Sequence, residues 1–297
     1  MSLFAPACLW DVGAELGEGA LWHAASGRVY FVDIKGSKIH RCAPDGSARR
    51  SWDTPHTPGF LLPVADGGFV CGMRGGLYRF DEQAGSFSLL HAVERDQPTN
   101  RLNDGYVDAG GALWFGSMDD LEESATGVLY RLGESGDARA MEREYIITNG
   151  PAMSPDGRTL YHADTLRKQV YAFDVMRNGR LERKRVFATI TGGAYPDGMA
   201  VDSDGDVWLA LFNGGRIERY NASGKLLASV ALPCSNVTKL AFGGDDLRTV
   251  FVTTAWKGMS AAQRASEPLA GGLFTFRTDT PGQQQHAFSI GALLEQH

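Results

Sequence analysis

Residues 149–164 read NGPAMSPDGRTLYHAD, and the same pattern begins earlier, at residue 18, as EGALWHAASGRVYFVD. In both stretches a polar residue starts a short apolar segment and a turn follows. A tyrosine and an aspartate then stand 12 and 15 residues after the first position. Two further copies, NDGYVDAGGALWFGS from Asn103 and DGMAVDSDGDVWLAL from Asp197, carry a tryptophan 11 residues on. Each copy predicts two short β-strands joined by a hairpin turn.

The repeat extends along the whole chain. The polar first positions at 103, 149 and 197 are 46 and 48 residues apart, and a degenerate copy falls around 60–80. A third strand is expected after each of six turns, at 38–41, 77–80, 129–132, 170–173, 216–220 and 273–276. A period in the forties with several strands per copy is typical of propeller blades. We therefore expect an all-β chain that forms a single six-bladed β-propeller domain over residues 1–297. It would have four antiparallel strands per blade, and the N-terminal strand around 8–10 would close the ring.

Composition excludes several functional classes. Glycine accounts for 37 of 297 residues, about 12% against a usual ~7%, which indicates many tight turns. The 29 basic and 35 acidic residues give a net charge of −6 with no basic run, so no nucleic-acid partner is expected. The longest apolar run, 207–212, is far shorter than the ~20 residues of a membrane span. No leader pattern opens the chain and four cysteines are scattered along it, so we expect a cytoplasmic protein with reduced thiols.

Four polar residues occupy the repeat's first position: Glu18, Asn103, Asn149 and Asp197. Equivalent residues of different blades converge at one mouth of a propeller, so these side chains would form a ring of oxygen donors. Two carboxylates buried together favour a divalent cation, and a site without Cys or His suits Ca²⁺, Mg²⁺ or Mn²⁺, with Fe²⁺ or Zn²⁺ possible. Each residue taken singly could instead cap a strand or a turn. Their matched offsets favour a metal site with open positions, as catalytic metal sites require.

Other features carry less weight. Arg101 would lie in the same mouth and suits an oxygen-rich ligand, although a surface role is an even alternative. The run Asp202 to Asp206 resembles the start of a calcium loop, but the required acidic residue would fall on Asn213, so we interpret it as a turn. His162 could contact the pocket or pack in the core. Motifs of serine hydrolases, zinc peptidases, nucleotide hydrolases and dinucleotide-binding proteins are missing from the sequence.

Several segments in order resemble the senescence marker protein/regucalcin/gluconolactonase family of sugar lactone lactonases. They are LGEG at 16–19, YFVD at 30–33, NRLNDG at 100–105, TNG at 148–150, SPDG at 154–157, YPDG at 195–198 and FGG at 242–244. The stretches around 114–130, 147–151 and 236–239 look closest to the bacterial xylono- and arabinolactonases. The resemblance spans nearly the whole chain.

The resemblance implies residue roles. Glu18, Asn149 and Asp197 match the family's metal ligands, while Arg101 and Asn103 match its substrate-binding residues. An acidic substrate contact follows the GSM motif and could be Asp120, Glu122 or Glu123; we select Glu122 as the candidate. The metal would be one divalent ion: Ca²⁺, Zn²⁺, Mn²⁺, Mg²⁺ or Fe²⁺.

The implied activity is the hydrolysis of a sugar lactone, with a pentonolactone such as xylonolactone or arabinolactone as the expected substrate and the aldonic acid as product. Asp197 would accept the proton of the attacking water as the catalytic base. The alternatives are a non-catalytic calcium-binding propeller and an esterase or organophosphate hydrolase on the same fold. The expected partner is a small-molecule sugar lactone, and the chain would act as a monomer or small homo-oligomer.

Overall fold

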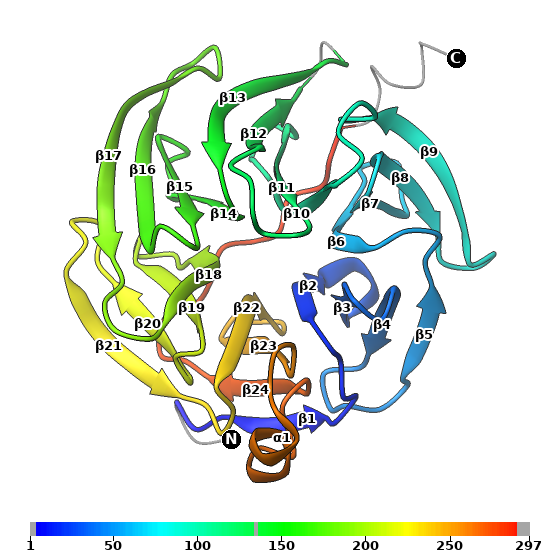
Figure 1. Ribbon diagram of the computed structural model, residues 1–297, viewed down its shortest axis with the longest axis vertical. Coiled ribbons are helices and arrows are strands. Elements are labelled where there is room, and N and C mark those ends of the chain that lie inside the picture. The colour runs from blue at the N-terminus through cyan, green and yellow to red at the C-terminus, as the bar shows by residue number, and fades with distance from the viewer. Residues whose placement is uncertain (1–3, 134–135, 290–297) are drawn as a thin grey trace.

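The computed structural model describes residues 4–133 and 136–289, which form a ring of six four-stranded antiparallel sheets (Figure 1). In five sheets the strands follow one another outward in chain order, from an innermost strand beside the central axis to an outermost strand at the rim. The predicted six-bladed propeller is confirmed. All six third strands fall where the repeat places them.

The blades are numbered by their innermost strand in chain order. Blade 1 contains β2 (Gly17–His23), β3 (Arg28–Asp33), β4 (Lys38–Cys42) and β5 (Arg50–Asp53). Blade 2 contains β6 (Pro58–Pro63), β7 (Phe69–Met73), β8 (Gly76–Asp81) and β9 (Ser86–Ala92). Blade 3 contains β10 (Asn100–Val107), β11 (Leu113–Asp119), β12 (Gly127–Leu132) and β13 (Ala138–Tyr145).

The second half of the ring repeats this order. Blade 4 contains β14 (Thr148–Met153), β15 (Thr159–Asp164), β16 (Gln169–Val175) and β17 (Leu181–Thr189). Blade 5 contains β18 (Tyr195–Val201), β19 (Val207–Phe212), β20 (Arg216–Tyr220) and β21 (Leu226–Ala231). Blade 6 contains β22 (Asn236–Gly243), β23 (Thr249–Ala255), β24 (Leu273–Arg277) and β1 (Ala7–Trp10). Helix α1 (Ala261–Ser266) lies between β23 and β24, and a short 3₁₀ turn (Ala24–Ser26) links β2 to β3.

The N-terminal strand closes the ring. Strand β1 pairs antiparallel with β24, so that Ala7 lies opposite Thr275 and Cys8 opposite Phe274. Figure 1 shows β1 at the outer edge of blade 6, beside the last strands of the chain. The first and the last strand of the chain therefore share one sheet, as predicted, and the outer edge of β24 is covered.

Turn aspartates hold the repeat's tryptophans. The Asp108 and Asp202 carboxylates each accept the indole N–H of a buried tryptophan, Trp114 and Trp208, at 2.8 Å. The other Asp202 oxygen accepts the backbone N–H groups of Asp204 and Asp206 at 3.0 Å. The calcium-loop-like run is thus a hairpin turn, as interpreted from the sequence.

A β-bulge interrupts every innermost strand. The pairing register shifts between Glu18 and Leu21 in β2, and comparable shifts occur in β6, β10, β14, β18 and β22. A bulge redirects side chains next to it, so residues at the start of each inner strand can turn toward the axis. Glycine is needed beside one of them, because a Cβ at Gly198 would lie 2.8 Å from the carbonyl oxygen of Thr238.

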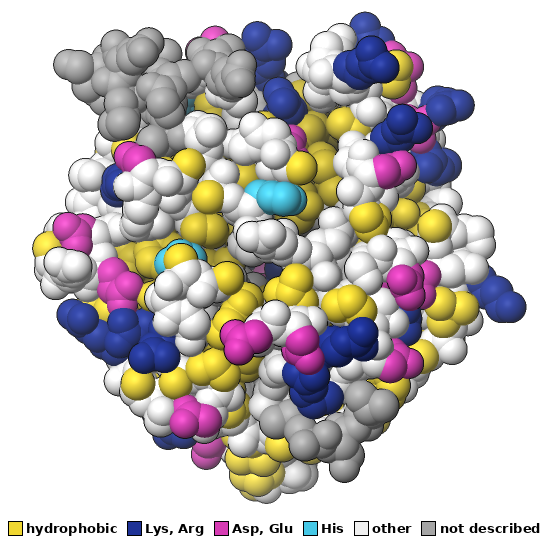
Figure 2. Space-filling model, turned by 180° about the vertical axis from the view of Figure 1, so that it is seen from behind, with side chains coloured by type: hydrophobic (Ala, Val, Ile, Leu, Met, Phe, Trp, Pro, Cys, Tyr) yellow, Lys and Arg dark blue, Asp and Glu magenta, His cyan; other side chains and the backbone are white. Residues whose placement is uncertain are grey.

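The C-terminal segment, residues 282–288, crosses the mouth of the ring that lies at the far ends of the inner strands, on the side away from the viewer in Figure 1. Gly282 bridges to Asp202 of blade 5 and Phe288 bridges to Val64 of blade 2, while the Gln283 amide donates to two inner-strand carbonyls. Figure 2 views this face, where a small cavity of about 80 Å³ remains. Within residues 4–133 and 136–289, no helix is long and apolar enough to cross a membrane.

Candidate active site

The six predicted site residues line one cavity at the front mouth of the ring. Glu18, Asn149 and Asp197 start the inner strands of blades 1, 4 and 5, Arg101 and Asn103 lie on β10, and Glu122 follows β11. The cavity has a volume of about 210 Å³. That is smaller than the ~300–1,000 Å³ typical of sites for drug-sized ligands, so it suits a molecule the size of a single sugar ring.

Two buried carboxylates meet in this cavity. Glu18 and Asp197 are 4% and 6% exposed, and each carboxylate shifts the pKa of the other. Burial and then the nearby Asp104 carboxylate raise the pKa of Glu18 to about 7. Burial and the Glu18 carboxylate raise the pKa of Asp197 well above its usual range. The pair therefore needs a shared proton or a cation between the two carboxylates.

The donor set fits a divalent cation. Two carboxylates and the Asn149 amide provide oxygen donors of the kind that hard metals prefer, and a cation would relieve the repulsion between Glu18 and Asp197. In the part of the chain that the structure describes, no cluster of three or more His, Cys, Asp or Glu side chains is arranged to hold a metal ion. The predicted set is not such a cluster, because Glu18 and Asp197 are acidic but the third ligand, Asn149, is an amide.

A chain of amides and a hydroxyl orients Asn149. The Asn103 amide donates to the Asn149 Oδ1 at 3.1 Å and to the Thr148 carbonyl at 2.6 Å. The Asn149 Nδ2 donates to the Thr165 hydroxyl at 2.8 Å, and that hydroxyl donates to the Pro196 carbonyl. The network fixes which Asn149 atom is the oxygen, and an amide oxygen retains a second lone pair for a ligand.

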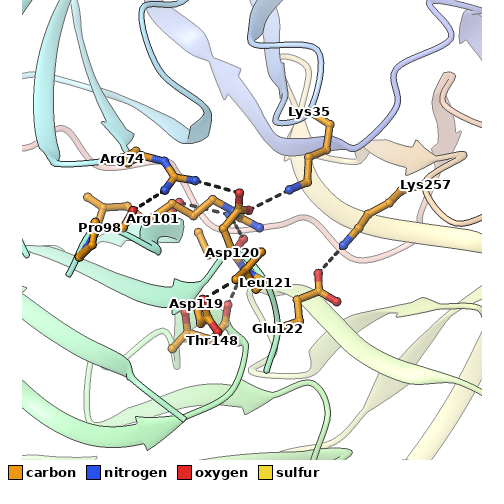
Figure 3. Close-up of polar contacts among 12 residues, drawn as sticks. Lys35, Arg74, Pro98, Arg101, Asp119, Asp120, Leu121, Glu122, Thr148 and Lys257 are labelled. Carbon is orange, nitrogen blue, oxygen red and sulfur yellow. Dashed lines mark hydrogen bonds and ion pairs between the residues drawn. The ribbon is translucent and has the colours of Figure 1, made fainter. Parts of the chain in front are cut away.

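Arg101 is held by a cluster of charged side chains beside the cavity (Figure 3). Its Nε donates to Asp120 at 2.6 Å, and a terminal nitrogen donates to the Asn103 side chain at 2.5 Å. Asp120 also accepts hydrogen bonds from Lys35 and Arg74, each at 2.9 Å. Although burial opposes ionisation, the Arg101 guanidinium and the hydrogen bonds from Lys35 and Arg101 lower the pKa of Asp120 to about 2.

The three acidic candidates after the GSM motif therefore lie in different surroundings. Asp120 neutralises basic residues and Glu123 is exposed, whereas Glu122 lines the cavity and pairs with Lys257. The structure places the selected residue, Glu122, where a substrate could reach it.

Sequence reasoning missed a buried ion pair directly beneath the carboxylates. Lys239 Nζ lies 2.5 Å from Asp104 Oδ2, and both side chains are less than 10% exposed. The same Asp104 oxygen accepts the Gly150 N–H at 3.0 Å. Asp104 directly follows Asn103 in the repeat, which was an available signal, but no repeat pattern marks Lys239 on β22.

An apolar wall completes the cavity and was also missed. It consists of Leu16, Ile34, Met118, Ile147, Leu166, Tyr195 and Phe212. Most of these residues lie at or just beyond strand ends in several blades, so their convergence follows from the ring and not from a local motif.

Of the two alternatives for His162, packing in the core is confirmed and contact with the cavity is wrong. Its side chain is fully buried on β15, packs edge-on against Tyr145 with ring centroids 4.7 Å apart, and is not part of the cavity wall. Neither ring nitrogen has a hydrogen-bond partner among the described residues. His162 is a core residue.

The buried His162 should make the stability of the folded protein sensitive to acid. Burial, followed by the nearby positive charges of Lys184 and Lys239, lowers its pKa to about 3, against ~6.5 in an unfolded chain. The unfolded state therefore binds more protons below pH 6.5, and stability falls as pH decreases. On this account the wild type loses about 2 kcal/mol of unfolding free energy between pH 6.5 and pH 5, and His162→Phe should not show this loss. Urea denaturation at the two pH values measures it. The matched change at exposed His56 should leave the slope unaltered. An unaltered slope in His162→Phe would contradict the assignment.

The sequence and the fold have clear relatives. A family model described as the SMP-30/Gluconolactonase/LRE-like region matches residues 16–256. The 6-deoxy-6-sulfogluconolactonase of Pseudomonas putida is 32% identical over 285 residues, 95% of this chain and 98% of the relative. The L-arabinolactonase of Azospirillum brasilense is 34% identical over 289 residues, 95% of this chain and 94% of the relative. A calcium-binding regucalcin from Agrobacterium tumefaciens superposes with a TM-score of 0.92 at 27% identity, covering 96% of this chain and 97% of that structure.

Proposed function

The chain belongs to the SMP-30/gluconolactonase/LRE-like family, and from that premise we propose that it is a metal-dependent hydrolase of a monosaccharide lactone. The observation that carries the proposal is the convergence of Glu18, Asn149, Asp197, Arg101 and Asn103 on one small cavity. The names of relatives support lactone hydrolysis, since two of them are named as a 6-deoxy-6-sulfogluconolactonase and an L-arabinolactonase, after a six-carbon and a five-carbon sugar. A pentonolactone remains the predicted substrate.

Glu18, Asn149 and Asp197 would hold one divalent ion. The regucalcin neighbour described as calcium-binding supports a divalent metal, and Ca²⁺, Zn²⁺, Mn²⁺, Mg²⁺ and Fe²⁺ are all candidates. When bound, such an ion supplies Lewis acidity toward the lactone carbonyl and lowers the pKa of water.

The side chains of the cavity divide the remaining work. Asp197 accepts a proton from the water that adds to the carbonyl carbon. The ring C–O bond then breaks, and the same proton passes from Asp197 to the departing ring oxygen, which becomes the hydroxyl of the hydroxy acid. Arg101 and Asn103 hold the hydroxyl groups of the sugar, and Glu122 accepts a further hydroxyl hydrogen bond. The apolar wall packs against the C–H face of the ring and excludes bulk water.

A hydrolysis assay tests this function. Xylono-, arabinono- and gluconolactone are incubated with purified protein, and the spontaneous opening of each lactone is subtracted. We expect a rate above this blank that EDTA abolishes and that one or more of the five divalent ions restores. The absence of any chelator-sensitive rate with pentono- and hexonolactones would refute the proposal. Metal binding without turnover would favour a calcium-binding propeller, and faster hydrolysis of aryl esters would favour an esterase.

A further inference from the structure

One ion pair spans the mouth of the cavity. Lys257 Nζ contacts Glu122 Oε1, and both side chains line the cavity wall (Figure 3). Glu122 belongs to blade 3 and Lys257 to blade 6, which face each other across the ring. The side chains are 32% and 29% exposed. An ion pair of such exposure adds only about 0–1 kcal/mol to stability, so folding alone gives little reason for it.

The pair joins the two longest of the six connections between the second and third strands of a blade. In each blade, the segment between the second and third strands lies on the same side of the ring as the start of the inner strand, and the segments of blades 1, 3, 4 and 6 contribute residues to the cavity wall. These segments are 34–37, 74–75, 165–168 and 213–215 in blades 1, 2, 4 and 5, but 120–126 in blade 3 and 256–272 in blade 6. Only the two extended segments reach far enough to meet across the mouth.

The Glu122 end is fixed by its own loop. The Asp119 carboxylate, 3% exposed, accepts backbone N–H groups from Leu121, Glu123 and Ser124 at 3.1–3.3 Å. The Glu122 N–H donates to the Asp119 carbonyl at 3.0 Å, and Glu122 adopts a left-handed φ of 62°. This backbone turns Glu122 toward the cavity and leaves it little freedom to withdraw.

The Lys257 end is fixed as firmly. The backbone N–H groups of Trp256 and Lys257 both donate to the Glu15 carbonyl, at 3.2 and 2.9 Å. The Lys257 carbonyl accepts the Asn236 amide at 3.1 Å, and the Trp256 indole donates to the Gly13 carbonyl at 3.0 Å. Two anchored backbones therefore hold the pair across the mouth.

Resting on the proposed function, we propose that the Glu122–Lys257 pair is a specificity-determining wall that limits the carbon chain carried by the lactone ring. In this proposal the lactone carbonyl lies at Glu18 and Asp197 on the inner strands, and the exocyclic carbons extend toward Glu122 and Lys257, which line the same cavity. There the pair closes a cavity of about 210 Å³. Lys257 donates to the terminal hydroxyl of a chain that fits, and a longer chain must displace the Lys257 side chain.

Two lactones isolate this effect. L-arabinono-1,4-lactone and D-galactono-1,4-lactone have the same ring configuration and differ by one exocyclic CHOH group. Discrimination of one such group by a shaped pocket typically amounts to about 10–200-fold. We expect the wild-type protein to favour the arabinono compound by about tenfold or more in kcat/KM.

The decisive variant is Lys257→Ala, which removes the wall but no group that contacts the reacting carbonyl. We expect the ratio of kcat/KM for the two lactones to fall about tenfold, through a lower KM for the galactono compound. Lys257→Arg should preserve the ratio because it retains a cation opposite Glu122. Lys38→Ala breaks a surface ion pair with Asp53, away from the cavity, and should also preserve the ratio.

The outcomes separate the two proposals. Hydrolysis of both lactones with no preference in the wild type, or a ratio that Lys257→Ala leaves within threefold, overturns the wall and leaves the proposed function intact. Failure of the wild type to hydrolyse any lactone overturns the proposed function and the wall with it. If Lys257→Ala does not fold by circular dichroism, Glu122→Ala removes the opposite half of the wall and must shift the ratio in the same direction.

Discussion

Asp197→Asn is expected to lower kcat for lactone hydrolysis by about a thousandfold. An asparagine has the size of the aspartate but can neither accept the proton of water nor carry the negative charge that favours a cation. General-base catalysis contributes about 10²–10⁴-fold, so the loss falls within that range or exceeds it if metal affinity also drops. Single-turnover kinetics would measure the chemical step, and calorimetry would measure metal affinity separately.

The same variant carries its own control for folding. Burial and the adjacent Glu18 carboxylate raise the pKa of Asp197, which means that the folded metal-free protein contains unfavourable carboxylate repulsion. A neutral side chain removes that repulsion, so the metal-free Tm of Asp197→Asn should equal or exceed that of the wild type. Asp204→Asn, in an exposed turn of the same blade, should retain both activity and Tm. Wild-type kcat in Asp197→Asn would exclude Asp197 as the base.

The fold could be predicted because each blade repeats the same local chemistry. Turn residues, an apolar inner strand and an aromatic second strand recur with a nearly constant period, and a ring packs such units side by side and leaves only short edges at the outermost strands. Glu18, Asn103, Asn149 and Asp197 share one repeat position, so blade symmetry alone brings them to one mouth. Arg101 follows because it lies two residues before Asn103 on the same strand.

The remaining site residues break the repeat and could not be placed in this way. Lys257 lies in a connection that has no counterpart of similar length in the other blades, and its partner Glu122 is 135 residues away. The choice among Asp120, Glu122 and Glu123 depends on the path of one loop, which Asp119 sets through three backbone hydrogen bonds. For His162 the sequence left a core role and a pocket role open, and its packing against Tyr145 inside the blade decides for the core.

Lys239→Met is expected to lower the free energy of unfolding by about 3–5 kcal/mol. The lysine ammonium is the ion-pair partner of Asp104 at 2.5 Å, and the two side chains are 8% and 2% exposed. Removing one member of a buried pair leaves an uncompensated charge, which is far more costly than the pair is stabilising. Urea denaturation of metal-free protein at neutral pH would measure the loss.

The double variant Asp104→Asn/Lys239→Met distinguishes a charge effect from a packing effect. It removes both charges while the asparagine carbonyl can still accept the Gly150 N–H, so we expect it to recover most of the stability lost in Lys239→Met. Equal losses in the single and double variants would instead show that stability depends on packing of the Lys239 hydrocarbon chain. This chain lies tightly against Gly198, where an added Cβ would be 2.2 Å from the Lys239 Cδ.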